Sequence, residues 1–165
     1  MSELDSQFTG RSGHLAVMAE FLHRGINVAI PEVDIGDDIF VVRGGDEAVT
    51  RVQVKSANGM AQQDGSYFAQ FNVPWLQLNK DDTPAFVYVF AVRYQDRWSD
   101  FIVIRREVLS QFQEDTGVGS IIRDLRGEAL SLMPRLVFSA SDVVNKQVSF
   151  QRFRGAFEPW PPAQP

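Results

Sequence analysis

Two neighbouring runs of residues constrain the fold of this chain more than any other feature of its sequence. Residues 39–42 are apolar at every position, whereas residues 49–55 alternate between apolar and polar side chains. An entirely apolar strand is covered on both faces of its sheet, and an alternating strand keeps one polar face. The turn residues Gly44, Gly45 and Asp46 separate the two runs. We therefore expect two adjacent strands in a sheet that has other layers packed on both sides.

A helix is expected before these strands. Turn residues precede it and Ser12 is a good N-cap, so residues 1–10 are expected to form a short flexible lead. The helix then runs to about Arg24 and ends at Gly25, a residue type that is common at helix C-termini. Its expected buried stripe recurs at helical spacing and consists of Leu15, Met18, Ala19 and Leu22, widened by Val17 and Phe21.

Further strands and short helices are expected along the rest of the chain. Strands are predicted at residues 27–30, 67–73, 85–92, 98–104 and 135–138, and helices at residues 74–78 and 107–114. Residues 56–66 are polar and contain glycine, which favours a mobile loop, and Ser141 is a candidate cap of a short helix. This order indicates one α/β (α+β) domain over residues 1–165. A helix is followed by a three-stranded meander in a central mixed sheet that helices flank.

Composition excludes several kinds of site. The chain has 165 residues, no Cys and 2 His, which excludes disulfides, zinc–thiolate sites and cysteine nucleophiles and disfavours a histidine-rich metal site. No apolar run approaches the ~20 residues of a membrane helix. The N-terminus is acidic and lacks the apolar core of a secretory signal, so a cytoplasmic protein is expected. The net charge of −5 argues mildly against strong nucleic-acid binding.

Three polar residues on the two adjacent strands are candidate site residues. Asp38 enters the apolar strand, where a carboxylate is costly unless it is paired or bound to a cation. The alternative is a solvated carboxylate that closes a turn with Gly36 and Asp37. Gln53 and Lys55 share one face of the second strand because side chains alternate. The alternative for this pair is an ordinary amphipathic strand with one solvated side.

A fourth candidate, Glu20, lies on the expected helix at the edge of its apolar stripe. Taken alone, it is expected to be a solvated surface glutamate near His23 and Arg24, since glutamate is mostly exposed in proteins.

Together these residues resemble the PD-(D/E)XK nuclease superfamily, in the variant where glutamine replaces the acidic residue before X-Lys. The matching pattern consists of Gly13-(x6)-Glu20, Gly25 with Pro31, Gly36-Asp37-Asp38-Ile39, and Gln53-Val54-Lys55-Ser56. The resemblance covers residues 10–105 as a nuclease-like core. It leaves residues 106–158 as a C-terminal elaboration and residues 159–165 as a flexible tail. It implies a restriction-endonuclease-like fold and metal-dependent hydrolysis of DNA phosphodiesters.

The resemblance also implies a metal site. Asp38 would bind Mg²⁺ (or Mn²⁺), with Asp37 and Asp34 as competing carboxylates. Gln53 would offer its side-chain oxygen and Val54 its backbone carbonyl, since Mg²⁺ prefers oxygen ligands and keeps several waters. A glutamine removes one negative charge, so weaker metal binding is expected than at an all-carboxylate site.

Two further roles follow from the same resemblance. Glu20 would support the metal, directly or through water. Lys55 would orient or activate the attacking water and stabilise charge on the phosphate. Glu20, Asp38, Gln53 and Lys55 are therefore the predicted catalytic residues.

DNA is the expected partner. Arg11, Ser12 and Gly13 lie at the predicted helix N-terminus, where free N–H groups would favour a phosphate, with simple capping as the alternative. Ser56 and Asn58 begin the expected loop, which reaches a groove of DNA or is an ordinary solvated connection.

The assembly and activity of such a protein have open alternatives. Cutting both strands usually needs two active sites, so a homodimer is a hypothesis, to which an exposed Trp160 could contribute. A second hypothesis is a catalytically inactive member of the same fold that binds nucleic acid or protein. A third is a protein-interaction domain with accidental motif matches.

Overall fold

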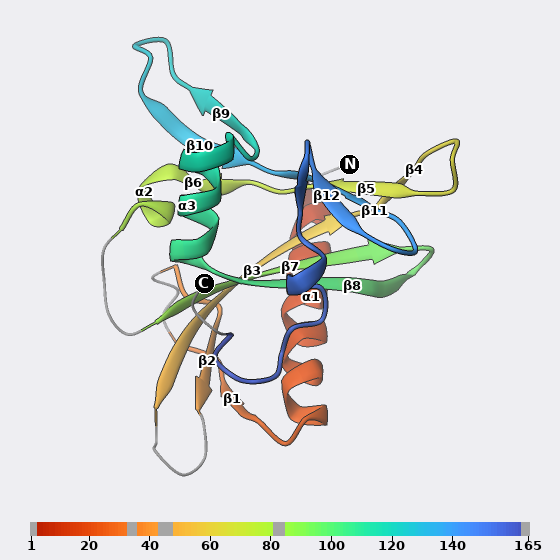
Figure 1. The fold of residues 1–165 in the computed structure, drawn as a ribbon. Coiled ribbons are helices and arrows are strands. Elements are labelled where there is room, and N and C mark those ends of the chain that lie inside the picture. The colour runs from red at the N-terminus through yellow and green to blue at the C-terminus, as the bar shows by residue number, and fades with distance from the viewer. Residues whose placement is uncertain (1–2, 33–35, 43–47, 81–84, 163–165) are drawn as a thin grey trace.

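The computed structural model describes residues 3–32, 36–42, 48–80 and 85–162, which surround a five-stranded mixed sheet (Figure 1). Its strand order is β1-β2-β3-β7-β8. The strands are β1 (Asn27–Ala29), β2 (Ile39–Val42), β3 (Val49–Asn58), β7 (Phe86–Tyr94) and β8 (Arg97–Arg105). All neighbours are antiparallel except β3 and β7, which are parallel. The predicted three-stranded meander in a central mixed sheet is therefore confirmed, while the expected turn at residues 44–46 lies outside the described residues.

Helix α1 (Glu3–His23) covers one face of this sheet. It begins well before Ser12, so the predicted flexible lead is wrong. The Ser12 hydroxyl donates to the Thr9 carbonyl at 3.2 Å within the helix and caps nothing. The predicted end is correct, because Gly25 adopts φ +72° and its N–H donates to the Leu22 carbonyl at 3.0 Å.

The buried face of α1 differs from the predicted stripe. Val17 and Phe21 are fully buried against β2, β3 and β7, whereas Leu15 and Leu22 are 52% and 56% exposed. The helix turns this way because Gly13 lets it approach β3 closely. A Cβ built on Gly13 would lie 1.9 Å from the Ser56 hydroxyl oxygen. The missing side chain, more than the leucines, therefore determines the contact face.

The opposite face of the sheet carries α2 (Trp75–Leu78), α3 (Arg106–Thr116) and most of the aromatic core. Both helices were predicted within a residue or two. Phe86, Tyr88 and Phe90 alternate along β7 and are buried on this side. The sheet is thus covered on both faces, as the apolar run 39–42 indicates.

Two smaller sheets complete the fold. One has the order β6 (Val73–Pro74), β10 (Ala129–Met133), β9 (Ser120–Arg123), and in Figure 1 the β9–β10 hairpin projects from one end of the molecule. The other has the order β13 (Val148–Ser149), β12 (Val143–Asn145), β11 (Arg135–Phe138), β5 (Tyr67–Gln70), β4 (Met60–Ala61). The expected mobile loop at residues 56–66 is wrong, because β3 continues to Asn58 and β4 pairs with β5. The predicted helix after Ser141 is also wrong, since β12 follows it.

The C-terminal segment packs against α1 after a short 3-10 helix, η1 (Gln151–Phe153). Phe157 and Trp160 meet the Phe21 ring edge-on, with centroids 5.1 and 4.6 Å away. Trp160 is only 6% exposed, so it is not available as a surface aromatic for a second copy. Of the helices described, none is long and apolar enough to cross a membrane.

Candidate functional site

The predicted site residues meet where β2 begins beside β3. Asp38 directly precedes β2, and its backbone N–H donates to the Val52 carbonyl at 3.0 Å. Its Oδ2 atom accepts the Val54 backbone N–H at 2.7 Å and the Gln53 Nε2 group at 2.5 Å. The Asp38 carboxylate is thus held by β3, and the alternative of a solvated turn carboxylate is wrong.

Lys55 lies on the same face of β3 as Gln53, two residues and about 6–7 Å farther along the strand. Gln53 is buried and Lys55 is half-buried, so this face is not the solvated side of an amphipathic strand. The strand therefore presents an amide that contacts Asp38 and an ammonium group two residues farther along the same face.

Sequence analysis missed Gln77, a residue of α2 that controls the orientation of the Gln53 amide. Gln77 Nε2 donates to the Gly36 carbonyl at 2.9 Å and to Gln53 Oε1 at 2.7 Å. Its own Oε1 accepts the Tyr88 hydroxyl at 3.3 Å. Nothing in the local pattern around residue 77 indicates this role, because its partners are distant in sequence.

These contacts make Gln53 a hydrogen-bond donor to Asp38. Turning the Gln53 amide over would set its oxygen against the Asp38 carboxylate and its nitrogen against Gln77 Nε2. Gln77 cannot turn in compensation, since its oxygen would then face the Gly36 carbonyl. The predicted use of the Gln53 oxygen as a metal ligand is therefore not the arrangement in this structure.

His14 is a second residue that sequence analysis missed. Its Nε2 atom lies 3.5 Å from Asp38 Oδ2, and it follows Gly13 on the side of α1 that approaches β3. The sequence places His14 directly after Gly13, but the apolar stripe was assigned to the wrong side of the helix, so this position was not predicted as part of the site.

Glu20 is not brought to Asp38. It forms an ion pair with Arg24 at 2.6 Å, one helical turn away on α1. It lies six residues beyond His14, about 9 Å farther along the helix axis. The α1 side chain that approaches Asp38 is that of His14.

Asp37, one of the two competing carboxylates, does not replace Asp38. Asp37 is 3% exposed and makes two hydrogen bonds, at 3.0 and 2.9 Å, with the Arg51 guanidinium Nε. Asp34 lies outside the described residues. Within the part of the chain that the structure describes, Asp38 is thus the carboxylate that meets Gln53.

The donor set fits a divalent cation with few protein ligands. Among the described residues, no three histidine, aspartate or glutamate side chains are grouped as metal ligands. Asp38 supplies a carboxylate, which accepts the Val54 N–H, and the carbonyl of the same Val54 residue is the second candidate ligand. Mg²⁺ commonly binds through one or two carboxylates, waters and substrate phosphate, so this set is sufficient.

Comparison with known proteins supports the nature of the fold. No family model matches the chain, and no curated protein matches it. The chain is similar to the structure of a bacterial homing endonuclease, I-Ssp6803I, with a TM-score of 0.52 and 17% sequence identity. The similarity covers 92% of this chain and 88% of that chain. The chain has a nuclease-like fold.

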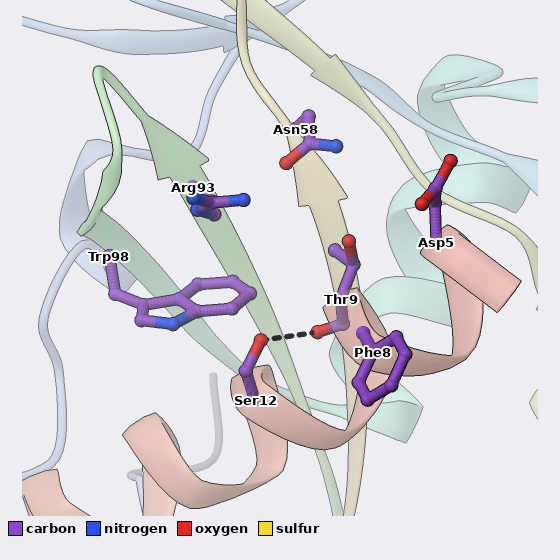
Figure 2. A pocket seen from close by; sticks show the side chains of 7 residues that line it. All are labelled: Asp5, Phe8, Thr9, Ser12, Asn58, Arg93 and Trp98. Atoms are coloured by element: carbon purple, nitrogen blue, oxygen red, sulfur yellow. Dashed lines mark hydrogen bonds between the residues drawn. The ribbon is translucent and has the colours of Figure 1, made fainter. Parts of the chain in front are cut away.

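In this nuclease-like fold, the residues predicted to touch DNA are divided between two environments. Arg11, Ser12 and Gly13 lie in the middle of α1, so the predicted anion site at a helix N-terminus is wrong. Gly13 and the Ser56 hydroxyl are buried against each other. Arg11 is exposed, and Ser12 and Asn58 line a surface cavity (Figure 2).

Proposed function

We propose that this protein is a Mg²⁺-dependent endonuclease that hydrolyses DNA phosphodiesters, as a member of the PD-(D/E)XK superfamily with a Gln-x-Lys motif. One observation carries the proposal. Asp38 and Gln53 converge at the start of β2, Lys55 follows on the same face of β3, and the surrounding fold is nuclease-like.

In this proposal Asp38 is the principal cation ligand, with the Val54 carbonyl as its neighbour. The Val54 N–H and the Gln53 amide hold the carboxylate in place, and hydrogen bonds to a carboxylate favour its charged form. A bound Mg²⁺ or Mn²⁺ would polarise the phosphoryl oxygen and lower the pKa of its water.

Lys55 has the second role. Its ammonium group orients the attacking water and stabilises the negative charge that grows on the phosphate. The oxygen of that water forms the new bond to phosphorus as its proton passes to solvent, and the bond to the leaving ester oxygen breaks as that oxygen takes a proton from solvent. Glu20 is left out of this scheme because its carboxylate pairs with Arg24.

The alternative is an inactive member of the same fold that binds nucleic acid or protein. An amide in place of a second carboxylate and the net charge of −5 favour this alternative. The amide weakens cation binding and the negative net charge weakens phosphate binding, but neither removes Asp38 or Lys55.

Plasmid cleavage in Mg²⁺ and in EDTA separates the two functions. We expect wild type to cut the plasmid only with the cation, and Lys55→Ala to lose this activity. Lys146→Ala is the matched control, since Lys146 lies on the exposed β12–β13 turn and bonds the Gly117 carbonyl. Equal cleavage by Lys55→Ala would reject the proposal. Salt-sensitive DNA binding without cleavage would favour the binding module.

A homodimer is part of the proposal, because cutting both strands uses two active sites. Analytical ultracentrifugation with and without a DNA duplex tests it, and a monomer under both conditions would contradict it.

A further inference from the structure

A surface cavity of about 620 Å³ lies between the N-terminal half of α1 and the ends of three central strands. Figure 2 shows Phe8 and Ser12 on α1, Asn58 at the end of β3, Arg93 on β7 and Trp98 on β8 around this space. Asp5 lines it at the start of α1. Its volume lies within the usual range for small-molecule pockets.

The cavity is separate from the site at Asp38 but connected to it along β3. Asn58 is five residues beyond Gln53 on this strand, about 16 Å at the usual rise of a β-strand. That length corresponds to about five nucleotides of one strand in a regular duplex. Asn58 points to the opposite face of β3 from Gln53, so a DNA strand bound at Asp38 reaches the cavity by passing the edge of β3 beyond Val52, where its pairing with β2 ends.

The lining chemistry suits a flat, uncharged group. The Trp98 ring extends from β8 towards α1, where a Cβ built on Gly13 would lie 3.0 Å from it, and Phe8 is 68% exposed. The lining holds one carboxylate, Asp5, and one guanidinium, Arg93, which pairs with Asp96 at 3.1 Å. These opposite charges give no net attraction for a phosphate, whereas aromatic faces stack on any nucleobase.

We propose that this cavity receives an unstacked nucleobase of the DNA strand that occupies the site at Asp38. The proposal rests on the proposed nuclease function. Trp98 and Phe8 supply the stacking surfaces. The Asn58 amide both donates and accepts hydrogen bonds at the base edge, and the Asp5 carboxylate accepts from an N–H group of the base, such as the imino group of thymine.

Binding of single-stranded DNA in EDTA tests the cavity without requiring cleavage. Fluorescence anisotropy would compare a thymine oligonucleotide of about twelve nucleotides with an abasic oligonucleotide of equal length and charge. We expect wild type to bind the thymine oligonucleotide more tightly. Phe8→Ala should lower that affinity about five- to hundredfold, in line with loss of one stacked base, and leave abasic binding unchanged.

Two variants make this result specific. Leu15→Ala is the matched control, since Leu15 is an apolar residue on the same helix that is 52% exposed and lies outside the cavity, and the variant should bind as wild type does. Asn58→Ala tests the polar edge at an exposed position with little cost to folding. It should also weaken thymine binding and leave abasic binding unchanged.

Equal affinity of wild type for the two oligonucleotides would overturn the proposal, as would an equal loss for both in Phe8→Ala. If wild type shows no base-dependent binding but still cuts plasmid, the nuclease function stands without the base pocket. Base-dependent binding by a protein that does not cut plasmid would keep the pocket and reject the nuclease function.

Discussion

The role of Gln77 predicts that one substitution lowers the stability of the protein but strengthens its metal binding. Gln77→Met keeps the length of the side chain but removes its hydrogen bonds to Gly36, Gln53 and Tyr88. Each such bond contributes about 0.5–1.5 kcal/mol net, and Gln77 is half-buried, so we expect the free energy of unfolding without metal to fall by about 2 kcal/mol.

The same substitution should strengthen metal binding. In wild type, turning the Gln53 oxygen towards a cation would break the 2.7 Å hydrogen bond from Gln77. It would also set the NH₂ group of Gln53 against that of Gln77, at a total cost of about 1–3 kcal/mol. Gln77→Met removes this cost. Mn²⁺ affinity should therefore rise about tenfold, the factor that about 1.4 kcal/mol represents.

Isothermal titration calorimetry with Mn²⁺ measures the affinity, and urea unfolding in EDTA measures the stability. Gln63→Met is the control, because Gln63 is exposed on the hairpin between β4 and β5. A gain in Mn²⁺ affinity that persists in the double variant Gln53→Met/Gln77→Met would refute the reasoning, since this gain must come from the Gln53 oxygen. Unchanged or weaker Mn²⁺ binding by folded Gln77→Met would refute it as well.

Two further predictions concern stability. Gly13→Ala should lower the free energy of unfolding by about 1–3 kcal/mol because its Cβ would overlap Ser56. Gly10→Ala on the same helix, where a Cβ meets nothing within 4 Å, should raise the free energy of unfolding by up to about 1 kcal/mol. Thermal unfolding of both variants checks this, and equal effects would contradict it. Burial and a hydrogen bond donated to Asp100 raise the pKa of Tyr67 above its ordinary value of 10.0. The unfolded chain then releases this proton above about pH 10 while the folded chain keeps it, so stability should fall as pH rises further, and Tyr67→Phe should show a smaller fall in alkaline urea titrations.

The central strands could be predicted from sequence because their patterns are local. The apolar run at residues 39–42 and the alternation at residues 49–55 each determine a strand without reference to distant residues. The pairing of Asp38 with Gln53 followed from the register of the two strands.

The buried face of α1 could not be predicted in the same way. Counting apolar residues gave Leu15 and Leu22 the core positions, but the closest contact of the helix is made by a residue without a side chain. Gly13 faces Ser56 on a strand far along the chain, and only the folded arrangement shows it. For this reason His14 was missed and Glu20 was placed in the site, since the position of both depends on how the helix is rotated.

Gln77 shows a second limit. Its position on a short helix was predicted, but its partners Gly36, Gln53 and Tyr88 come from separate elements. A hydrogen-bond network of this kind depends on tertiary packing and leaves no periodic pattern in the sequence.

The most direct test of the site is the initial rate of plasmid cleavage in Mg²⁺ for wild type, Asp38→Asn and Glu20→Gln. Asp38→Asn keeps the shape of the side chain but removes the cation ligand, which should lower the rate by at least about a hundredfold. Glu20→Gln should cleave at the wild-type rate, because Glu20 pairs with Arg24 away from Asp38. Wild-type activity in Asp38→Asn, or an equal loss in Glu20→Gln, would contradict the account.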